Sequence, residues 1–289
     1  MSRWARFFLW LGGIAALIVA VLVLNGFRGR LGWTADAEPP DEIAALIGPA
    51  MRWTVPDGAG PHPVALLLSG CNGPQSNLDR LARDLLAAGW ASVIVDSHSP
   101  RELDEAQLWR LVCAGQVLNG AERAADIAVT LAMVRGRPEL DAGHVALIGL
   151  SHGGWTSLDY LALALESTLP PLLTAWPEAI QDDPLAGIRN AIFFYPYCGP
   201  AGRGLSEELP SDISYLFQLV EGDIIANEAR CFEIAGRLLS VDADVSVTVY
   251  EGVTHNFDDP EQSFLSPLAF DAAARDAATA ATLRALGPP

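Results

Sequence analysis

Apolar residues occur in this chain as one long run near the start and then as short runs between polar, glycine-containing segments. The long run, Phe7 to Leu24, contains no charged residue. The short runs lie at 64–68, 91–95, 144–148, 191–195, 215–220 and 245–250. Short continuous apolar runs bounded by turn residues are typical of strands that are buried on both faces, as in a parallel sheet. The pattern therefore predicts an apolar N-terminal helix followed by a domain with a mostly parallel sheet.

Segments of helical character separate these strands. They lie at 78–88, where Asn77 is placed to cap the helix, and at 121–134, 154–165, 227–239 and 267–286. Before the first central strand, residues 43–55 are expected to form a helical turn and an edge strand, and Pro56-Asp57-Gly58 a hairpin turn. Strands that alternate with helices predict an α/β fold in which right-handed crossovers join parallel strands.

One connection is long and irregular. Residues 167–190 are rich in proline and contain Trp176. Long irregular segments in compact domains are often lids or binding walls, so this segment is a candidate cover for a site. A surface insertion with no role in a site is the alternative.

The strand at 144–148 runs directly into Gly149-Leu150-Ser151-His152-Gly153, which is a G-x-S-x-G sequence. Because a helical segment follows, Ser151 is expected on a sharp strand-to-helix turn that holds its hydroxyl clear of the sheet. Glycines suit such a turn, since a side chain there would collide with the neighbouring strand or helix. The alternative is a serine that only caps the following helix.

A catalytic serine needs a base, and the base needs an acid that orients it. On strand-turn-helix folds of this kind the three residues follow the order Ser, Asp or Glu, His. His255 is the only histidine downstream of the serine, and it follows the apolar run at 245–250. Asp223 follows the run at 215–220 and is the preferred acid, with Glu221 as the second choice. Ser151, His255 and Asp223 are therefore the predicted catalytic residues.

These segments resemble the dienelactone hydrolase family of the α/β-hydrolase superfamily. The resemblance rests on Pro63 to Gly73, Asp96 to Arg101, Arg123 to Asp126, Gly149 to Gly154, Phe194 to Pro196, Gly222-Asp223 and His255 to Asp258. It implies an eight-stranded, mostly parallel sheet and hydrolysis of an ester or lactone. The chain departs from the family pattern in three places: a serine replaces the cysteine nucleophile of the namesake enzymes, the acid directly follows Gly222, and Ser69-Gly70 stands where the family often has His-Gly.

The resemblance also implies an oxyanion hole. In the superfamily it combines an N–H group from the loop after the first central strand with that of the residue after the nucleophile. This assigns the backbone N–H groups of Cys71 and His152. Arg101 and Trp176 are candidates for the substrate mouth; Arg101 is expected either to pair with Asp96 or to contact a carboxylate substrate.

The apolar run from Phe7 to Leu24 would measure about 27 Å as a helix, which is close to the hydrocarbon thickness of a bilayer. We expect an uncleaved membrane anchor at 1–30, a linker and edge strand at 31–60, and an α/β-hydrolase domain at 61–289. A cleaved signal peptide, with Ala35-Asp36-Ala37 as its cleavage site, is the alternative. The small bias of the flanking arginines places the catalytic domain outside the cytoplasm.

Composition and charge exclude some classes of partner and cofactor. The net charge of −17 would repel phosphate backbones, so no nucleic-acid partner is expected. Sequences typical of metal or dinucleotide sites, such as C-x-x-C, H-E-x-x-H and G-x-G-x-x-G after the first strand, do not occur, and neither a metal nor a cofactor is expected. Four cysteines in an extracytoplasmic domain make a disulfide plausible, with Cys198 and Cys231 as first candidates.

The sequence thus predicts a membrane-tethered serine hydrolase that acts on a small-molecule carboxylic ester or lactone. Two alternatives stay open: a peptidase or acyltransferase that uses the same three residues, and a membrane-tethered binding protein that keeps the fold without turnover. The oligomeric state is not predicted.

Overall fold

A parallel sheet forms the centre of the chain in the computed structural model, which describes residues 2–31, 36–262 and 266–289. Its seven strands have the order β1-β3-β2-β4-β5-β6-β7. They are β1 (Arg52–Thr54), β2 (His62–Leu68), β3 (Ala91–Val95), β4 (Leu140–Leu150), β5 (Ile188–Phe194), β6 (Ser214–Val220) and β7 (Val245–Tyr250). All neighbours pair in parallel except β1, which is antiparallel to β3. The predicted α/β fold is confirmed, with seven strands in the described residues and not eight.

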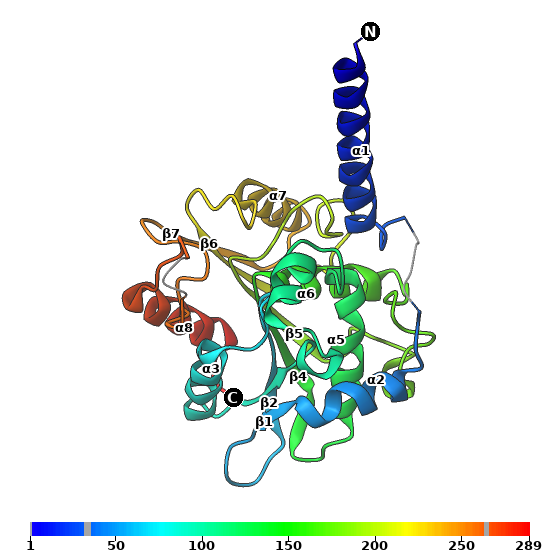
Figure 1. The fold of residues 1–289 in the computed structure, drawn as a ribbon. Helices are drawn as coiled ribbons and strands as arrows, with labels where there is room; N and C mark the ends of the chain where they lie inside the picture. The colour runs from blue at the N-terminus through cyan, green and yellow to red at the C-terminus, as the bar shows by residue number, and fades with distance from the viewer. Residues whose placement is uncertain (1, 32–35, 263–265) are drawn as a thin grey trace.

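Helices cover both faces of this sheet (Figure 1). One core cluster contains apolar side chains of α2 (Pro40–Ile47), α5 (Gly120–Arg135), α6 (His152–Leu165) and α7 (Glu228–Leu239). The other cluster contains those of α3 (Ser76–Ala87) and α8 (Ala272–Leu286). Single helical turns occur at η1 (Gly48–Ala50), η2 (Ser99–Arg101), α4 (Glu105–Gln107), η3 (Leu108–Val112) and η4 (Glu178–Ile180).

Strand β2 shows why the central strands are continuously apolar. Val64, Leu66 and Leu68 belong to one core cluster, whereas Ala65 and Leu67 belong to the other. Successive side chains of a strand point to opposite faces, and both faces are covered by helices, so every position from Pro63 to Leu68 is buried.

Two local predictions are wrong. Asn77 does not cap α3, because the helix begins at Ser76 and Asn77 lies inside it. The side-chain amide of Asn77 instead donates to Asp258 Oδ2 at 3.1 Å. Pro56-Asp57-Gly58 does not close a hairpin, because β1 pairs with β3 and not with the strand that follows it. In both cases a partner far away in the sequence determines the local structure.

Helix α1 (Arg3–Gly26) projects away from the domain (Figure 1), and none of its residues is buried. Its mean hydropathy of 2.8 makes it long and apolar enough to cross a membrane, a test that a signal sequence also passes. The alternative cleavage site at Ala35-Asp36-Ala37 lies partly outside the described residues.

Candidate active site

Ser151 lies on the turn between β4 and α6, and its backbone is strained. Its φ of 50° and ψ of −111° fall in a region that side chains rarely adopt. The flanking glycines permit the turn: a Cβ atom on Gly149 would lie 2.5 Å from the carbonyl carbon of Gly153, and one on Gly153 would lie 2.2 Å from the carbonyl oxygen of Leu68. Close backbone approach therefore explains both glycines of the G-x-S-x-G sequence.

The structure brings the three predicted catalytic residues together. His255 Nε2 lies 2.9 Å from Ser151 Oγ, and His255 Nδ1 lies 2.6 Å from Asp223 Oδ2. The three residues follow β4, β6 and β7, whose carboxyl ends lie at one edge of the sheet. A hydroxyl, an imidazole and a carboxylate thus form a continuous chain of hydrogen bonds.

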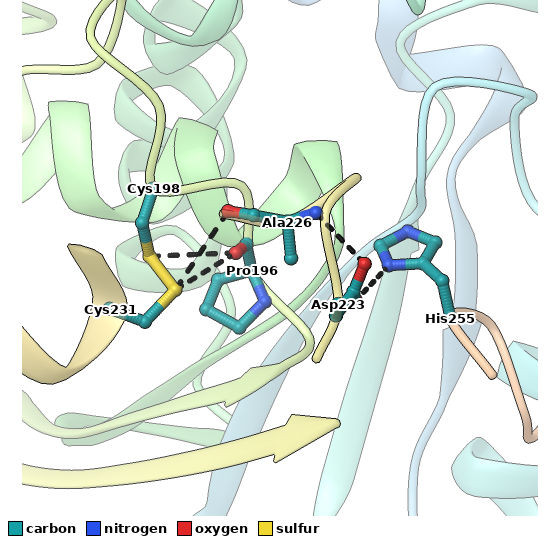
Figure 2. Close-up of a disulfide and its surroundings, with 6 residues drawn as sticks. All are labelled: Pro196, Cys198, Asp223, Ala226, Cys231 and His255. Atoms are coloured by element: carbon teal, nitrogen blue, oxygen red, sulfur yellow. Dashed lines mark hydrogen bonds and ion pairs between the residues drawn. A yellow bond between two sulfur atoms is a disulfide. The ribbon is translucent and has the colours of Figure 1, made fainter. Parts of the chain in front are cut away.

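Asp223 is held as a carboxylate. Burial acts to raise its pKa, but hydrogen bonds from His255 and from the N–H groups of Ala226 and Ile225 outweigh burial and lower the pKa below the ordinary value. Figure 2 shows Asp223 between Ala226 and His255. Glu221, the other candidate acid, is exposed. The short loop after β6 therefore still brings a carboxylate to the histidine.

The residues of the predicted oxyanion hole, Cys71 and His152, both line the cavity that contains Ser151. Among the described residues, neither backbone N–H group has a hydrogen-bond acceptor. The N–H of His152 also lies at the start of α6, where the first N–H groups of a helix have no partner within the helix. This arrangement fits the predicted oxyanion hole.

Arg123 supports the loop that carries Cys71, and the sequence did not predict this role. Its buried guanidinium donates to the carbonyl oxygen of Ser69 at 2.7 Å and to Ser97 Oγ at 2.8 Å. Burial has the largest effect on the pKa of Arg123 and lowers it to about 10. Burial and the neighbouring Arg123 hold the pKa of His152 well below the ordinary value, so the His152 imidazole is neutral. The motif around Arg123 contributed to the family resemblance, but its partners lie far away in the sequence.

A second unpredicted group lies behind His255. The Tyr195 ring packs against the imidazole with ring centroids 4.7 Å apart, and its hydroxyl donates to Asp258 Oδ1. Asp258 also accepts a hydrogen bond from Asn77. Burial has the largest effect on the pKa of Asp258 and raises it. The network connects the end of β5, α3 and the histidine loop, so it supports the position of His255.

Two disulfides flank the site. The expected Cys198–Cys231 bond is present (Figure 2), and the Cys198 N–H donates to the carbonyl oxygen of Ala226 at 2.8 Å. A second bond, Cys71–Cys113, was not predicted and joins the loop after β2 to the segment after η3. Cys71 is therefore not a free thiol, and its sulfur is not available as a nucleophile. Each disulfide supports a different loop of the site.

The cavity has a volume of about 260 Å³. Its walls include Ser151, His255 and the two oxyanion residues, together with mostly apolar and aromatic residues: Gly26, Trp109, Gly115, Trp155, Tyr197, Ile225 and Leu268. Trp155 packs against Tyr197, with ring centroids 4.8 Å apart. None of these apolar and aromatic wall residues was predicted, because they come from α1, η3, α6 and several loops and share no sequence pattern.

The two mouth candidates do not line this cavity. Arg101 forms a two-pronged ion pair with Asp126, at 2.8 and 3.0 Å, so the expected pair with Asp96 is wrong. Asp96 instead accepts from the N–H groups of His98 and Ser99. Trp176 packs against Tyr160, which is part of the core and not of the cavity. Neither residue is in a position to contact a substrate at Ser151. In the part of the chain that the structure describes, no group of three or more metal-binding side chains occurs.

No protein-family model matches the chain. No curated protein matches it either. Solved structures do: a dienelactone hydrolase-like promiscuous phosphotriesterase from metagenomic libraries has 18% identity and a TM-score of 0.58, with 82% of this chain and 90% of that chain covered. A putative dienelactone hydrolase from Klebsiella pneumoniae has 16% identity and a TM-score of 0.60, with 82% and 91% covered. Esterase 2 of Thermogutta terrifontis, phosphorylated by paraoxon, has 12% identity and a TM-score of 0.59, with 80% and 85% covered.

These similarities cover 85–91% of each solved chain. The chain therefore has the α/β-hydrolase fold of the dienelactone hydrolase-like proteins.

Proposed function

We propose that the protein is a serine hydrolase that cleaves a carboxylic ester or lactone. The observation that carries the proposal is the contact of 2.9 Å between His255 Nε2 and Ser151 Oγ, with Asp223 bonded to the other ring nitrogen. A nucleophile, a base and an orienting acid in this order are the parts that acyl transfer to serine requires. The esterases and dienelactone hydrolases of similar fold support the same class of reaction.

The reaction proceeds in two steps. His255 Nε2 takes the proton of Ser151 Oγ as the oxygen attacks the ester carbonyl, and the imidazolium returns this proton to the leaving alcohol when the C–O bond breaks. Water then attacks the acyl-enzyme: His255 takes one proton from the water and returns it to Ser151 as the carboxylic acid leaves. Ester and water are consumed, and an acid and an alcohol are formed.

Charge in the transition state develops on the carbonyl oxygen and on the imidazole. The N–H groups of Cys71 and His152 stabilise the oxyanion, and the Asp223 carboxylate stabilises the imidazolium. The Asp223 pKa, lowered as described, keeps this carboxylate ionised at neutral pH. Its bond to Nδ1 also fixes the tautomer in which Nε2 accepts the serine proton.

The test is a fluorophosphonate probe together with ester kinetics. An activated serine forms a covalent bond with the phosphorus of such a probe, and the similar Thermogutta esterase is phosphorylated by paraoxon. We expect the wild type to be labelled and Ser151→Ala to be unlabelled, with kcat for a short-chain ester lower by about three to six orders of magnitude. Ser240→Ala, at the end of α7, is the control and should behave as the wild type. Near-full esterase activity of Ser151→Ala would overturn the proposal, and a wild type that is neither labelled nor active would favour a binding protein.

We also propose that α1 stays attached and anchors the domain outside the cytoplasm. Arg28, two residues beyond α1, forms a buried ion pair with Glu122 of α5. Cleavage after Ala37 would remove Arg28 and leave a buried carboxylate without its cation, which is costly. Two disulfides fit an oxidising compartment. Intact mass measurement of the protein from a membrane fraction should give the full chain of 30.8 kDa; a shorter chain that begins near residue 38 would contradict the anchor.

A further inference from the structure

The cavity of Ser151 lies directly beside the end of α1. Gly26, the last residue of the helix, lines the cavity together with Trp109 and Ile225. Gly26 is two positions beyond Leu24, where the charge-free run ends. At a rise of about 1.5 Å per residue, this corresponds to roughly 3 Å along the helix axis. The cavity wall therefore begins at the level where the membrane-compatible part of α1 stops.

The helix is attached firmly at this point. The Asn25 side-chain amide donates to the carbonyl oxygen of Gln116 at 2.9 Å, and Arg28 donates to that of Gly115 at 3.0 Å and to Glu122 Oε1 at 2.7 Å. Gly115 is itself a wall residue of the cavity. These contacts fix the direction of α1 relative to the cavity, and Figure 1 shows the helix pointing away from the domain.

Apolar side chains are exposed around the cavity. Trp109 and Ile225 line it and are 58% and 51% exposed, and the adjacent Ile224 is 93% exposed. Single exposed apolar residues are common on soluble surfaces, but several around one opening mark a binding or membrane surface. Tryptophan in particular favours the interface between membrane and water. Trp109, Ile224 and Ile225 form an apolar rim of the cavity, and this rim lies beside the end of α1.

The cavity itself suits an aliphatic group. Among the described residues that line it, none is Asp, Glu, Arg or Lys. Its volume of about 260 Å³ is below the roughly 300–1,000 Å³ of sites that enclose a drug-sized ligand. A larger apolar substrate would fill the cavity with the part next to the ester and leave the remainder outside, over Trp109 and Ile225.

We propose that the substrates are uncharged, long-chain aliphatic esters that reach Ser151 from the membrane surface. This inference rests on the proposed hydrolase function and on the uncleaved anchor. The apolar rim beside α1 receives the chain, and the chain passes from the bilayer to the cavity without full exposure to water. Transfer through water would cost about 0.8 kcal/mol per methylene group, so a continuous apolar path favours long chains.

The test compares two esters with the same leaving alcohol, using the full chain in phosphatidylcholine vesicles. Methylumbelliferyl acetate is soluble, whereas methylumbelliferyl oleate resides in the bilayer. We expect the oleate ester to be hydrolysed at a rate that falls when extra phosphatidylcholine dilutes it in the bilayer at constant bulk concentration. The acetate rate should not respond to this dilution.

Variants of the rim test the path. Trp109→Gln and Ile225→Ser should lower the ratio of oleate to acetate hydrolysis by roughly tenfold, the scale on which apolar contacts discriminate between substrates. Val241→Ser is the matched control, because Val241 is an aliphatic residue of similar exposure, 57%, that does not line this cavity. Its ratio should equal that of the wild type.

The possible outcomes distinguish failure of the membrane path from failure of the hydrolase function or of the uncleaved anchor. Hydrolysis of the acetate without the oleate ester, or an unchanged ratio in both rim variants, would overturn the membrane path and leave the hydrolase intact. Hydrolysis of neither ester, with no probe labelling of Ser151, would overturn the hydrolase and this inference with it. A chain that has lost α1 would overturn the anchor and therefore the path.

Discussion

At the scale of single residues, the strained backbone of Ser151 is the feature on which the site depends. The positive φ lifts the hydroxyl toward His255, and the close approach of Gly153 to Leu68 brings the turn against the strand that leads to the oxyanion loop. The strained turn is retained because β4 and α6 are both packed into the core on either side of it.

Two carboxylates compete for the role of acid in the sequence, and their variants can decide between them. Asp223→Asn should lower kcat by roughly 10³ to 10⁴, because an amide stabilises the wrong imidazole tautomer and carries no charge. Glu221→Gln is the matched control, two positions away and exposed, and should keep wild-type kcat. Ester kinetics of the two variants make the measurement; a loss in Glu221→Gln alone would reverse the assignment.

Asp159 of α6 makes the stability of the fold depend on pH. Burial, the largest cause, raises the pKa of Asp159 from 3.8 to about 7, although the carboxyl accepts from the Arg203 N–H at 2.6 Å. Between these two values the folded protein keeps a proton that the unfolded chain releases. The contribution of protonated Asp159 to the free energy of unfolding is therefore complete below pH 4, and it is lost as the pH rises to about 7.

Asp159→Asn keeps the acceptor and removes the titration. The difference in unfolding free energy between wild type and this variant, measured by urea titration from pH 4 to 8, should shift in favour of the variant as the pH rises. A difference that stays constant over this range would show that Asp159 does not titrate in the folded protein.

At the scale of elements, the Cys71–Cys113 bond connects the oxyanion loop after β2 to the segment after η3. Removal of an oxyanion donor costs about 10² to 10³ in kcat, so a loop that is only loosened should lose less, roughly tenfold. The double variant Cys71→Ser with Cys113→Ser should show this loss and a decrease in stability of about 2–4 kcal/mol. Ester kinetics and urea unfolding provide the two readouts. Reduced stability with unchanged kcat would mean that Arg123 alone holds the loop.

Elements with strong local patterns were predictable from the sequence. The bounds of β3 and β7 agree with the runs at 91–95 and 245–250. Every position of β3 is buried, whereas in the partly exposed β7 valines alternate with Ser246 and Thr248, and both patterns are typical of strands. Helix α3 was predicted, but its capping residue was not, because Asn77 contacts Asp258, 181 positions away. The partner of β1 was missed for the same reason: strand order depends on packing and not on local sequence.

The residues of the site also differ in whether the sequence could predict them. Ser151, Asp223 and His255 follow strands and have a fixed chain order, so the sequence could place them side by side. Arg123 and Tyr195 act through long-range contacts, and the cavity walls come from several separate loops and helices, so no local pattern marks them. Arg101 was misassigned because its partner, Asp126, is not its neighbour in the sequence.

At the scale of the whole molecule, the pair between Arg28 and Glu122 connects the N-terminal helix to the domain. Arg28→Met should destabilise the full chain in detergent micelles by about 3 kcal/mol, since it leaves Glu122 buried and unpaired. Adding Glu122→Gln should restore much of the loss, because the amide still accepts from the Asn119 N–H. Thermal unfolding of the three proteins gives the comparison. Equal losses in the single and double variants would assign the effect to the arginine stem and not to charge.

The attachment of α1 leaves almost no slack between a bilayer and the domain. A domain on a long flexible tether tumbles and spends only part of its time with its opening turned toward the lipids. Here Asn25 and Arg28 are hydrogen-bonded to Gln116 and to Gly115, a residue of the cavity wall, so the domain can rotate about the axis of α1 while its tilt relative to that axis stays fixed. In the proposed arrangement the search for substrate becomes two-dimensional, and the surface density of the ester, not its concentration in bulk water, sets the rate of encounter.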